Sequence, residues 1–156
     1  MATILLIGLD YHEYARAVAT ELITQGHSVS FHSIQPGKPY LKLLRKFAPE
    51  SYQPALDRYH ESLVEQERVN HYDIVLFIQV HQFSHANMAR LRSSQPDARF
   101  ILYNWDAVST HDYTPYLRYF DNVHTFDPKD ARRLGVRYLP LFCIRSFQEL
   151  PDRFES

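Results

Sequence analysis

The stretch Thr3-Ile4-Leu5-Leu6-Ile7-Gly8 decides the fold of this chain. It is a short, unbroken apolar run that ends in glycine, which is typical of a central parallel strand covered on both faces. Two further apolar runs follow at Asp73 to Gln79 and at Arg99 to Tyr103. Strand and helix patterns alternate about six times along the chain without an internal repeat, and this alternation predicts a doubly wound α/β fold.

We expect a Rossmann-like, mostly parallel sheet of six strands in the order 2-1-3-4-5-6, with helices on both faces. His27 to Ser33 alternates apolar and polar residues, which favours a strand near the sheet edge. Only this strand intervenes before a long excursion at residues 34–72, so the third strand is expected on the other side of the first. Within this excursion, a long charged helix is predicted from about Ala55 to Asn70, after the breaks at Pro49 and Pro54. The ligand crevice should then lie between strands one and three, at their carboxyl ends.

The size and composition fit a single globular domain. The chain has 156 residues, of which 45% are hydrophobic and 22% are charged, so it is neither short of a core nor disordered. The formal net charge of −1 removes the usual electrostatic case for a nucleic-acid binder. A single cysteine, Cys143, excludes an internal disulfide framework. We assign residues 1–142 to the domain and residues 143–156 to a tail or an exit toward a further domain.

Targeting and membrane signals are weak. The start of the chain does not have the order of a signal peptide, because Thr3 to Gly8 has the pattern of a strand. No apolar run approaches the ~20 residues that a spanning helix needs. A cytoplasmic location is therefore the default expectation.

One basic segment leaves a membrane-peripheral location open. Lys38 to Phe47 is predicted to form an amphipathic turn or helix. Its inward residues are expected to be Leu41, Leu44 and Phe47, and its outward strip is Lys38, Lys42, Arg45 and Lys46. This basic strip is either a solvated helix face or a contact with an anionic membrane surface or a lipid-linked acceptor.

The turn after the first strand, Gly8-Leu9-Asp10-Tyr11-His12-Glu13, lacks the features of a nucleotide cradle. A dinucleotide cradle needs several glycines so that backbone amides can approach a pyrophosphate, and this turn has one. Asp10 would in addition repel phosphate. We expect no nucleotide here, and Asp10 either caps the first helix or contributes to a ligand site.

The residues Asn104-Trp105-Asp106 follow the strand that ends at Tyr103. Open α/β sheets place ligand-handling residues at the carboxyl ends of such strands. A carboxylate beside Trp105 could accept a hydroxyl proton, and His111 lies close by in the sequence. In the alternative interpretation, Asn104 and Asp106 satisfy turn amides while Trp105 fills the core. Spacing alone does not separate the two.

Two more strand ends carry polar residues. His81 follows the second apolar run and is a candidate for hydrogen bonding or proton transfer in the crevice. His81 and His85 are four residues apart, as metal ligands sometimes are, but Ser84 is predicted to cap a helix between them and no third ligand is evident. We therefore expect no metal. Asp127 directly follows the short strand predicted at Asn122 to Phe126, and it is also the predicted N-cap of the next helix.

Three motifs resemble segments of the CgeB-like (spore maturation protein) and related lipopolysaccharide-biosynthesis glycosyltransferases. They are Leu102-Tyr-Asn-Trp-Asp106, Phe120-Asp-Asn-Val-His-Thr-Phe-Asp127 and Gly135-Val-Arg-Tyr-Leu-Pro-Leu-Phe142. The opening Ile4 to Asp10 is similar to the first strand and turn of that family. The resemblance implies a GT-B architecture, in which two Rossmann-like halves face each other across a cleft and catalysis typically needs no bound metal.

The resemblance also implies which half this chain is. It corresponds to the N-terminal, acceptor-side half, so the nucleotide sugar is expected on a separate C-terminal half and no cofactor is expected in this chain. The implied partners are a glycan or lipid-linked acceptor and the C-terminal GT-B domain, in the assembly of surface polysaccharide or lipopolysaccharide. A different function remains open, a stand-alone Rossmann-like module that binds or interacts without catalysis.

The expected site residues follow from their location at the strand ends. We expect Asp106 and His81 to be the catalytic residues that face the acceptor. The expected substrate-binding residues are Asp10, Tyr11, Trp105, Asn104, His111 and Asp127.

Overall fold

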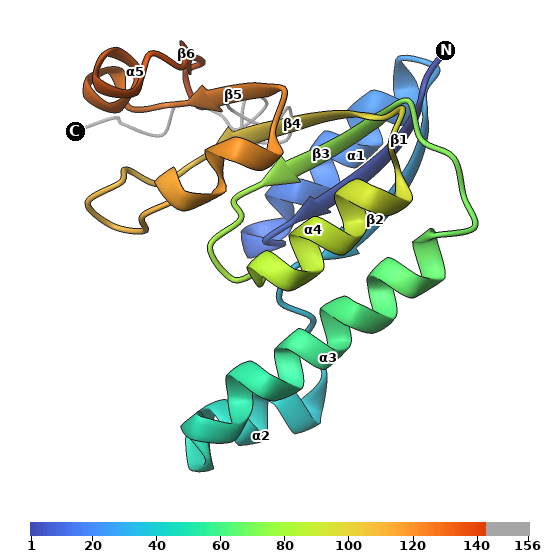
Figure 1. Cartoon of the computed structure of the whole chain (residues 1–156), viewed down its shortest axis with the longest axis vertical. Helices are drawn as coiled ribbons and strands as arrows, with labels where there is room; N and C mark the ends of the chain where they lie inside the picture. The colour runs from blue at the N-terminus through green and yellow to red at the C-terminus, as the bar shows by residue number, and fades with distance from the viewer. Residues whose placement is uncertain (143–156) are drawn as a thin grey trace, which may run out of the picture.

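Figure 1 shows a computed structural model of the chain, in which residues 1–142 are described. The strands form one six-stranded sheet in the order β2-β1-β3-β4-β5-β6, and every neighbouring pair is parallel. They span Thr3–Gly8 (β1), Ser28–Ser33 (β2), Ile74–Ile78 (β3), Arg99–Asn104 (β4), Asn122–Thr125 (β5) and Arg137–Tyr138 (β6). The predicted fold class and strand order are confirmed. The predicted tail, residues 143–156, lies outside the described residues.

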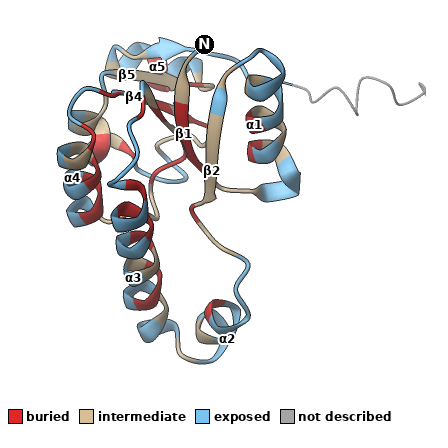
Figure 2. Cartoon of the chain, turned by 90° about the vertical axis from the view of Figure 1, so that its right-hand side faces the viewer, coloured by how far each residue is buried: buried red, intermediate tan, exposed pale blue. Residues whose placement is uncertain are grey.

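Helices cover both faces of the sheet. The α-helices are Tyr14–Thr24 (α1), Pro39–Phe47 (α2), Pro49–Glu67 (α3), His85–Ser94 (α4) and Pro128–Leu134 (α5), with 3-10 segments at Tyr11–Glu13 (η1) and Thr114–Tyr119 (η2). Figure 2 shows α1 on one side of β1 and β2, and α3 and α4 on the other. The paired helix layers explain why the central strands are apolar on both faces.

The core is divided by the sheet into two layers. Leu5 and Ile7 of β1 belong to the layer that contains side chains of α3 and α4. Leu6, between them, packs in the layer of Ala15 and Ala19 on α1. Successive residues of a strand point to opposite faces, so an unbroken apolar run serves both layers at once.

The predicted helix starts at two strand ends are confirmed. The Ser84 hydroxyl accepts a hydrogen bond from the backbone N–H of Asn87 at 3.3 Å and caps α4. The Asp127 carboxylate accepts from the backbone N–H of Lys129 at 2.6 Å and caps α5. At the other end of α5, Gly135 takes a left-handed conformation with φ of 67°, which glycine adopts without a steric penalty.

Two predictions for the excursion before β3 are wrong. The long helix begins at Pro49 rather than near Ala55, and Pro54 lies inside it. A proline at the first helical position is favourable, and the one inside removes a single backbone hydrogen bond that the rest of this long helix tolerates. Phe47 was expected to point inward, but it is 68% exposed, because Leu41 and Leu44 alone form the face of α2 that packs on α3.

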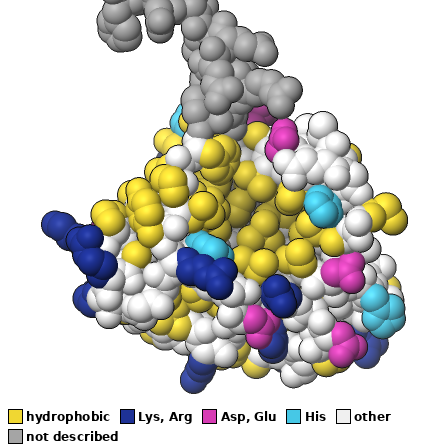
Figure 3. Space-filling view, turned by 90° about the horizontal axis from the view of Figure 1, so that it is seen from above, with side chains coloured by type: hydrophobic (Ala, Val, Ile, Leu, Met, Phe, Trp, Pro, Cys, Tyr) yellow, Lys and Arg dark blue, Asp and Glu magenta, His cyan; other side chains and the backbone are white. Residues whose placement is uncertain are grey.

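Apolar side chains also reach the surface. Figure 3 shows a face on which hydrophobic side chains gather in the centre while charged side chains lie mostly around them. The chain has exposed large apolar residues near the end of its described part: Tyr138, Leu139, Leu141 and Phe142. Among the helices of residues 1–142, none is both long and apolar enough to cross a bilayer.

Candidate functional site

A pocket of about 540 Å³ opens at the carboxyl edge of the sheet, within the usual range for small-molecule sites. Tyr11 and Tyr14 line it from the segment after β1, His81 from the segment after β3, and Trp105 and Asp106 from the segment after β4. The crevice predicted between strands one and three therefore extends to the end of β4. Parallel strands bring these segments to one edge although they are far apart in the sequence.

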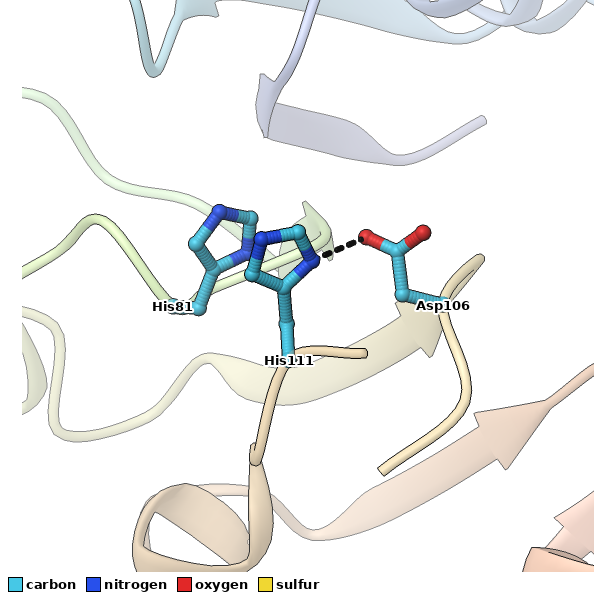
Figure 4. Close-up of side chains that lie close together, drawn as sticks. All are labelled: His81, Asp106 and His111. Atoms are coloured by element: carbon cyan, nitrogen blue, oxygen red, sulfur yellow. Dashed lines mark hydrogen bonds and ion pairs between the residues drawn. The ribbon is translucent and has the colours of Figure 1, made fainter. Parts of the chain in front are cut away.

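Asp106 is the most firmly positioned polar residue of the pocket. Its Oδ2 atom accepts a hydrogen bond from Gln79 Nε2 at 2.5 Å. The same atom accepts a second one from His111 Nδ1 at 3.1 Å, which Figure 4 shows. The Asn104 side chain donates to the backbone carbonyl of Asp106 at 2.5 Å. Asn104 is almost fully buried, so it fixes the turn that presents Asp106 and does not itself open into the pocket.

Gln79 has an unusual backbone conformation directly after β3. Its φ is +63°, a value that residues other than glycine rarely adopt. Such a conformation costs about 1–3 kcal/mol and tends to be retained at functional sites. Here it carries the Gln79 amide to the Asp106 carboxylate, so the strained residue belongs to the site.

His81 and His111 lie against each other. Their rings are stacked with centroids 3.9 Å apart and planes 11° from parallel (Figure 4). Burial lowers the pKa of His81 below the ordinary histidine value, and the charge on His111 lowers it further, while Asp106 acts in the opposite direction. His81 is therefore neutral at pH 7 and carries a free lone pair on one ring nitrogen.

Aromatic side chains line the part of the pocket around Trp105. The Trp105 ring makes edge-to-face contacts with Tyr14 at 6.2 Å and with Phe142 at 5.5 Å, measured between centroids. Tyr103 packs on the same indole at 5.7 Å. Trp105 is thus packed among aromatic neighbours and also lines the pocket. It combines the two roles that the sequence left open, packing in the core and contributing to a ligand site.

The structure separates the predicted site residues into two groups. Those that line the pocket are Tyr11, His81, Trp105, Asp106 and His111. The others have local structural contacts. Asn104 holds the turn, Asp127 caps α5, and Asp10 pairs with Arg16 at 3.0 Å without capping a helix. The binding and catalytic roles of all eight stay predictions.

Sequence reasoning missed six of the residues that line the pocket, which are Leu9, Tyr14, Gln79, Gln82, Leu141 and Phe142. Gln79 could have been found, since it directly follows the apolar run of β3. His85, four residues after His81, stacks on Tyr116 with ring centroids 4.3 Å apart, and the ring that contacts His81 is that of His111.

Three side chains of the site are able to hold a metal ion. The ligand atoms of His81, Asp106 and His111 all lie within 4.8 Å of one another. Two imidazoles and one carboxylate are ligands that zinc and related ions accept. The other side chains that line the pocket offer hydrogen bonds and aromatic surface, and they do not resemble a phosphate-binding loop.

No family model matches the chain, and no curated protein matches it in sequence. Among solved structures, MurG of Acinetobacter baumannii is similar, with a TM-score of 0.50 and 13% sequence identity. The similarity covers 82% of this chain and 42% of MurG, so the chain spans less than half the length of that protein. At this identity the likeness supports the Rossmann-like fold, and the resemblance to CgeB-like proteins stays a prediction.

Proposed function

We propose that this chain is the acceptor-binding half of a GT-B glycosyltransferase that acts in cell-surface polysaccharide biosynthesis. The observation that carries the proposal is a pocket at the carboxyl edge that combines an aromatic wall with a firmly held carboxylate. MurG, which is similar in fold over 42% of its length, is a GT-B glycosyltransferase. The CgeB-like motifs support lipopolysaccharide or a related polymer as the product.

The side chains of the pocket suit a sugar better than a nucleotide. Aromatic rings such as Trp105 can pack on the apolar face of a sugar ring, while Asp106 and His111 can exchange hydrogen bonds with its hydroxyl groups. Among residues 1–142, no lysine or arginine lines this pocket, and phosphate groups are usually held by such residues. The nucleotide sugar is therefore assigned to a separate C-terminal half.

Asp106 is the proposed proton acceptor for the attacking hydroxyl of the acceptor. It lines the pocket and its carboxylate is oriented from two sides, as a general base must be. His81 lies beside the same group through its stack with His111. Without a donor-binding half, this chain alone is expected to be catalytically silent, because the fold contributes chiefly the proximity of donor and acceptor.

Acceptor binding is tested by titrating the chain with short oligosaccharides and, separately, with UDP-N-acetylglucosamine, in buffer that contains EDTA. We expect the oligosaccharide to bind, and Trp105→Ala and Asp106→Asn each to weaken it roughly tenfold or more, since a hydrogen bond to a charged group contributes about 1.5–3 kcal/mol. Asp97→Asn is the matched control, because Asp97 is exposed and precedes β4 at the opposite edge of the sheet.

Two results would contradict this proposal. Binding of the nucleotide sugar without the oligosaccharide would make this chain the donor side. Oligosaccharide binding that is equal in wild type, Trp105→Ala and Asp106→Asn would move the glycan away from the pocket. Absence of binding to either ligand would instead favour the stand-alone module.

The basic strip on α2 is the proposed contact with a membrane that carries a lipid-linked acceptor. The helix exposes Tyr40, Leu43 and Phe47, at 48%, 59% and 68%, and the spacing of these residues puts them on one side. The neighbouring cations are Lys38, Lys42, Arg45 and Lys46. The chain leaves β2 at the carboxyl end of the sheet, where the pocket also lies, and continues through a loop to α2. Figure 1 shows α2 below the sheet, beside α3. Cations beside an exposed apolar stripe are typical of helices that lie on anionic bilayers.

Co-sedimentation with vesicles tests the role of this strip. The chain is expected to bind vesicles that contain phosphatidylglycerol and not vesicles of phosphatidylcholine alone. Replacing Lys42 and Lys46 by alanine should weaken binding roughly 30-fold, at about 1 kcal/mol for each basic side chain near the surface. The control replaces Arg99 and Arg137, both exposed on the sheet. Equal losses in the two double variants would contradict a specific role for α2.

A further inference from the structure

We propose that His81, Asp106 and His111 form a binding site for a divalent transition-metal ion such as Zn²⁺ or Co²⁺. The three residues come from the segments after β3 and β4 and face one another at the pocket (Figure 4). Two imidazoles with one carboxylate form a ligand set that leaves coordination positions open for water or substrate. Imidazole nitrogen favours zinc, cobalt and related ions over Mg²⁺ or Ca²⁺, which prefer oxygen ligands.

Two of the three ligands already have the separation that a metal requires. Metal–nitrogen and metal–oxygen bonds of about 2.0–2.1 Å in a tetrahedral site put ligand atoms about 3.3 Å apart. Asp106 Oδ2 and His111 Nδ1 are 3.1 Å apart. A metal ion would therefore replace the proton that these two atoms share, with little movement of either side chain.

His81 supplies the third ligand after a change in its ring orientation. Its Nδ1 atom is buried and has no hydrogen-bond partner among the described residues, which is an unfavourable state for a polar nitrogen. The ring is stacked parallel to that of His111, whereas a metal ion lies in the plane of each imidazole that binds it. Rotation about the Cβ–Cγ bond of His81 would break the stack and direct a nitrogen at the ion.

Gln79 supports the site from outside the ligand set. Its amide donates to the Oδ2 atom of Asp106 at 2.5 Å, so the carboxylate is oriented before any ion arrives. Hydrogen bonds of this kind to metal ligands typically change metal affinity 10- to 100-fold. The unusual backbone conformation of Gln79 has a purpose in this arrangement, because it carries the amide to the carboxylate.

The probe is the metal alone, with the full chain and no affinity tag. Co²⁺ is titrated while its visible absorption is recorded, and Zn²⁺ affinity is measured in competition with a chromophoric chelator. We expect one ion per chain, a tetrahedral Co²⁺ spectrum, and affinities at least about tenfold weaker in His81→Gln, His111→Gln and Asp106→Asn. His85→Gln is the matched control, since His85 stacks on Tyr116 and is not one of the three ligands.

Three outcomes would overturn the proposal. The wild-type chain could show no saturable metal binding, or His81→Gln and His111→Gln could both keep the wild-type Zn²⁺ affinity. The third is a loss of Zn²⁺ affinity in His85→Gln as large as that in the pocket variants. Thermal unfolding of each variant identifies any that fails to fold, and Gln79→Ala then gives a variant that leaves all three ligands in place. In that variant the proposal expects weaker Zn²⁺ binding, and unchanged binding contradicts it. The glycan titration is carried out in EDTA, so the two proposals fail independently.

Discussion

Replacing Phe77 by alanine is expected to lower the free energy of unfolding by about 3–5 kcal/mol, the range for removing a fully buried phenylalanine. The Phe77 side chain has no exposed surface and lies on β3, between β1 and β4. Its ring packs edge-on against Phe83 at 5.3 Å and against Phe120 at 5.6 Å between centroids. These two rings come from separate segments of the chain, one after β3 and one before β5, so they cannot close the cavity without moving the elements that carry them. Urea unfolding at neutral pH measures the loss.

Phe47→Ala is the control for this prediction. Phe47 is 68% exposed on α2, and replacement of such a surface residue usually changes stability by no more than about 0.5 kcal/mol. The described core would be wrong if Phe77→Ala lowered the free energy of unfolding by less than about 1 kcal/mol, or if both variants lowered it equally.

Replacing Glu67 by alanine is expected to lower the free energy of unfolding by roughly 1.5–3 kcal/mol, the range for a hydrogen bond to a charged group. Glu67 is 3% exposed at the end of α3. Its carboxylate accepts hydrogen bonds from the Tyr72 hydroxyl and from Asn70 Nδ2 at 2.8 Å, and it lies 2.7 Å from His32 Nε2. It therefore connects α3 to β2 and to the segment before β3, and the alanine variant removes the carboxylate from the buried Tyr72 hydroxyl and from the half-buried His32.

The stabilisation by Glu67 should depend on pH. Burial raises the pKa of Glu67, but the hydrogen bonds from Tyr72, Asn70 and His32 outweigh burial and hold this pKa below its ordinary value. A carboxylate with a lowered folded pKa contributes its stability above the unfolded pKa of about 4.3 and loses it as the pH falls through the folded pKa. The difference in free energy of unfolding between wild type and Glu67→Ala should therefore be largest near pH 7 and should decrease below about pH 4.

Glu65→Ala provides the matched control for the pH series. The Glu65 side chain is 69% exposed and pairs with Arg68 on the surface of the same helix. Exposed pairs of this kind contribute about 0–1 kcal/mol. A loss in Glu67→Ala as small as that in Glu65→Ala, or one that grows toward low pH, would contradict the buried cluster.

The fold was predictable because the strongest signals in the sequence are local. The runs at Thr3 to Gly8 and Asp73 to Gln79 have no polar interruption that would suit an edge strand, and both became central strands. The caps at Ser84 and Asp127 were visible for the same reason, since each acts on the next turn of its own helix. The start of α3 was misplaced because proline is a breaker in a helix interior but a favourable first residue, and sequence alone did not say which applied at Pro49.

The site was predictable in location but only partly in detail. The strand order brings the carboxyl ends of β3 and β4 to one side of the sheet, so the sequence alone groups His81, Trp105 and Asp106. The pairing of His81 with His111 depends on the path of the loop after Trp105, for which residue spacing carries no signal. The positive φ of Gln79 is likewise a property of the folded loop, because glutamine has no intrinsic preference for it.

The central claim is that the pocket beside Trp105 holds the acceptor glycan, and the single tryptophan makes a direct measurement available. The chain gives one indole N–H signal in a nitrogen–proton NMR spectrum, and this signal can be followed while an oligosaccharide is added. We predict that it shifts and saturates with the same dissociation constant as the backbone amides of Gln79 and Asp106. An indole signal that stays fixed while the oligosaccharide shifts amides elsewhere would contradict the account.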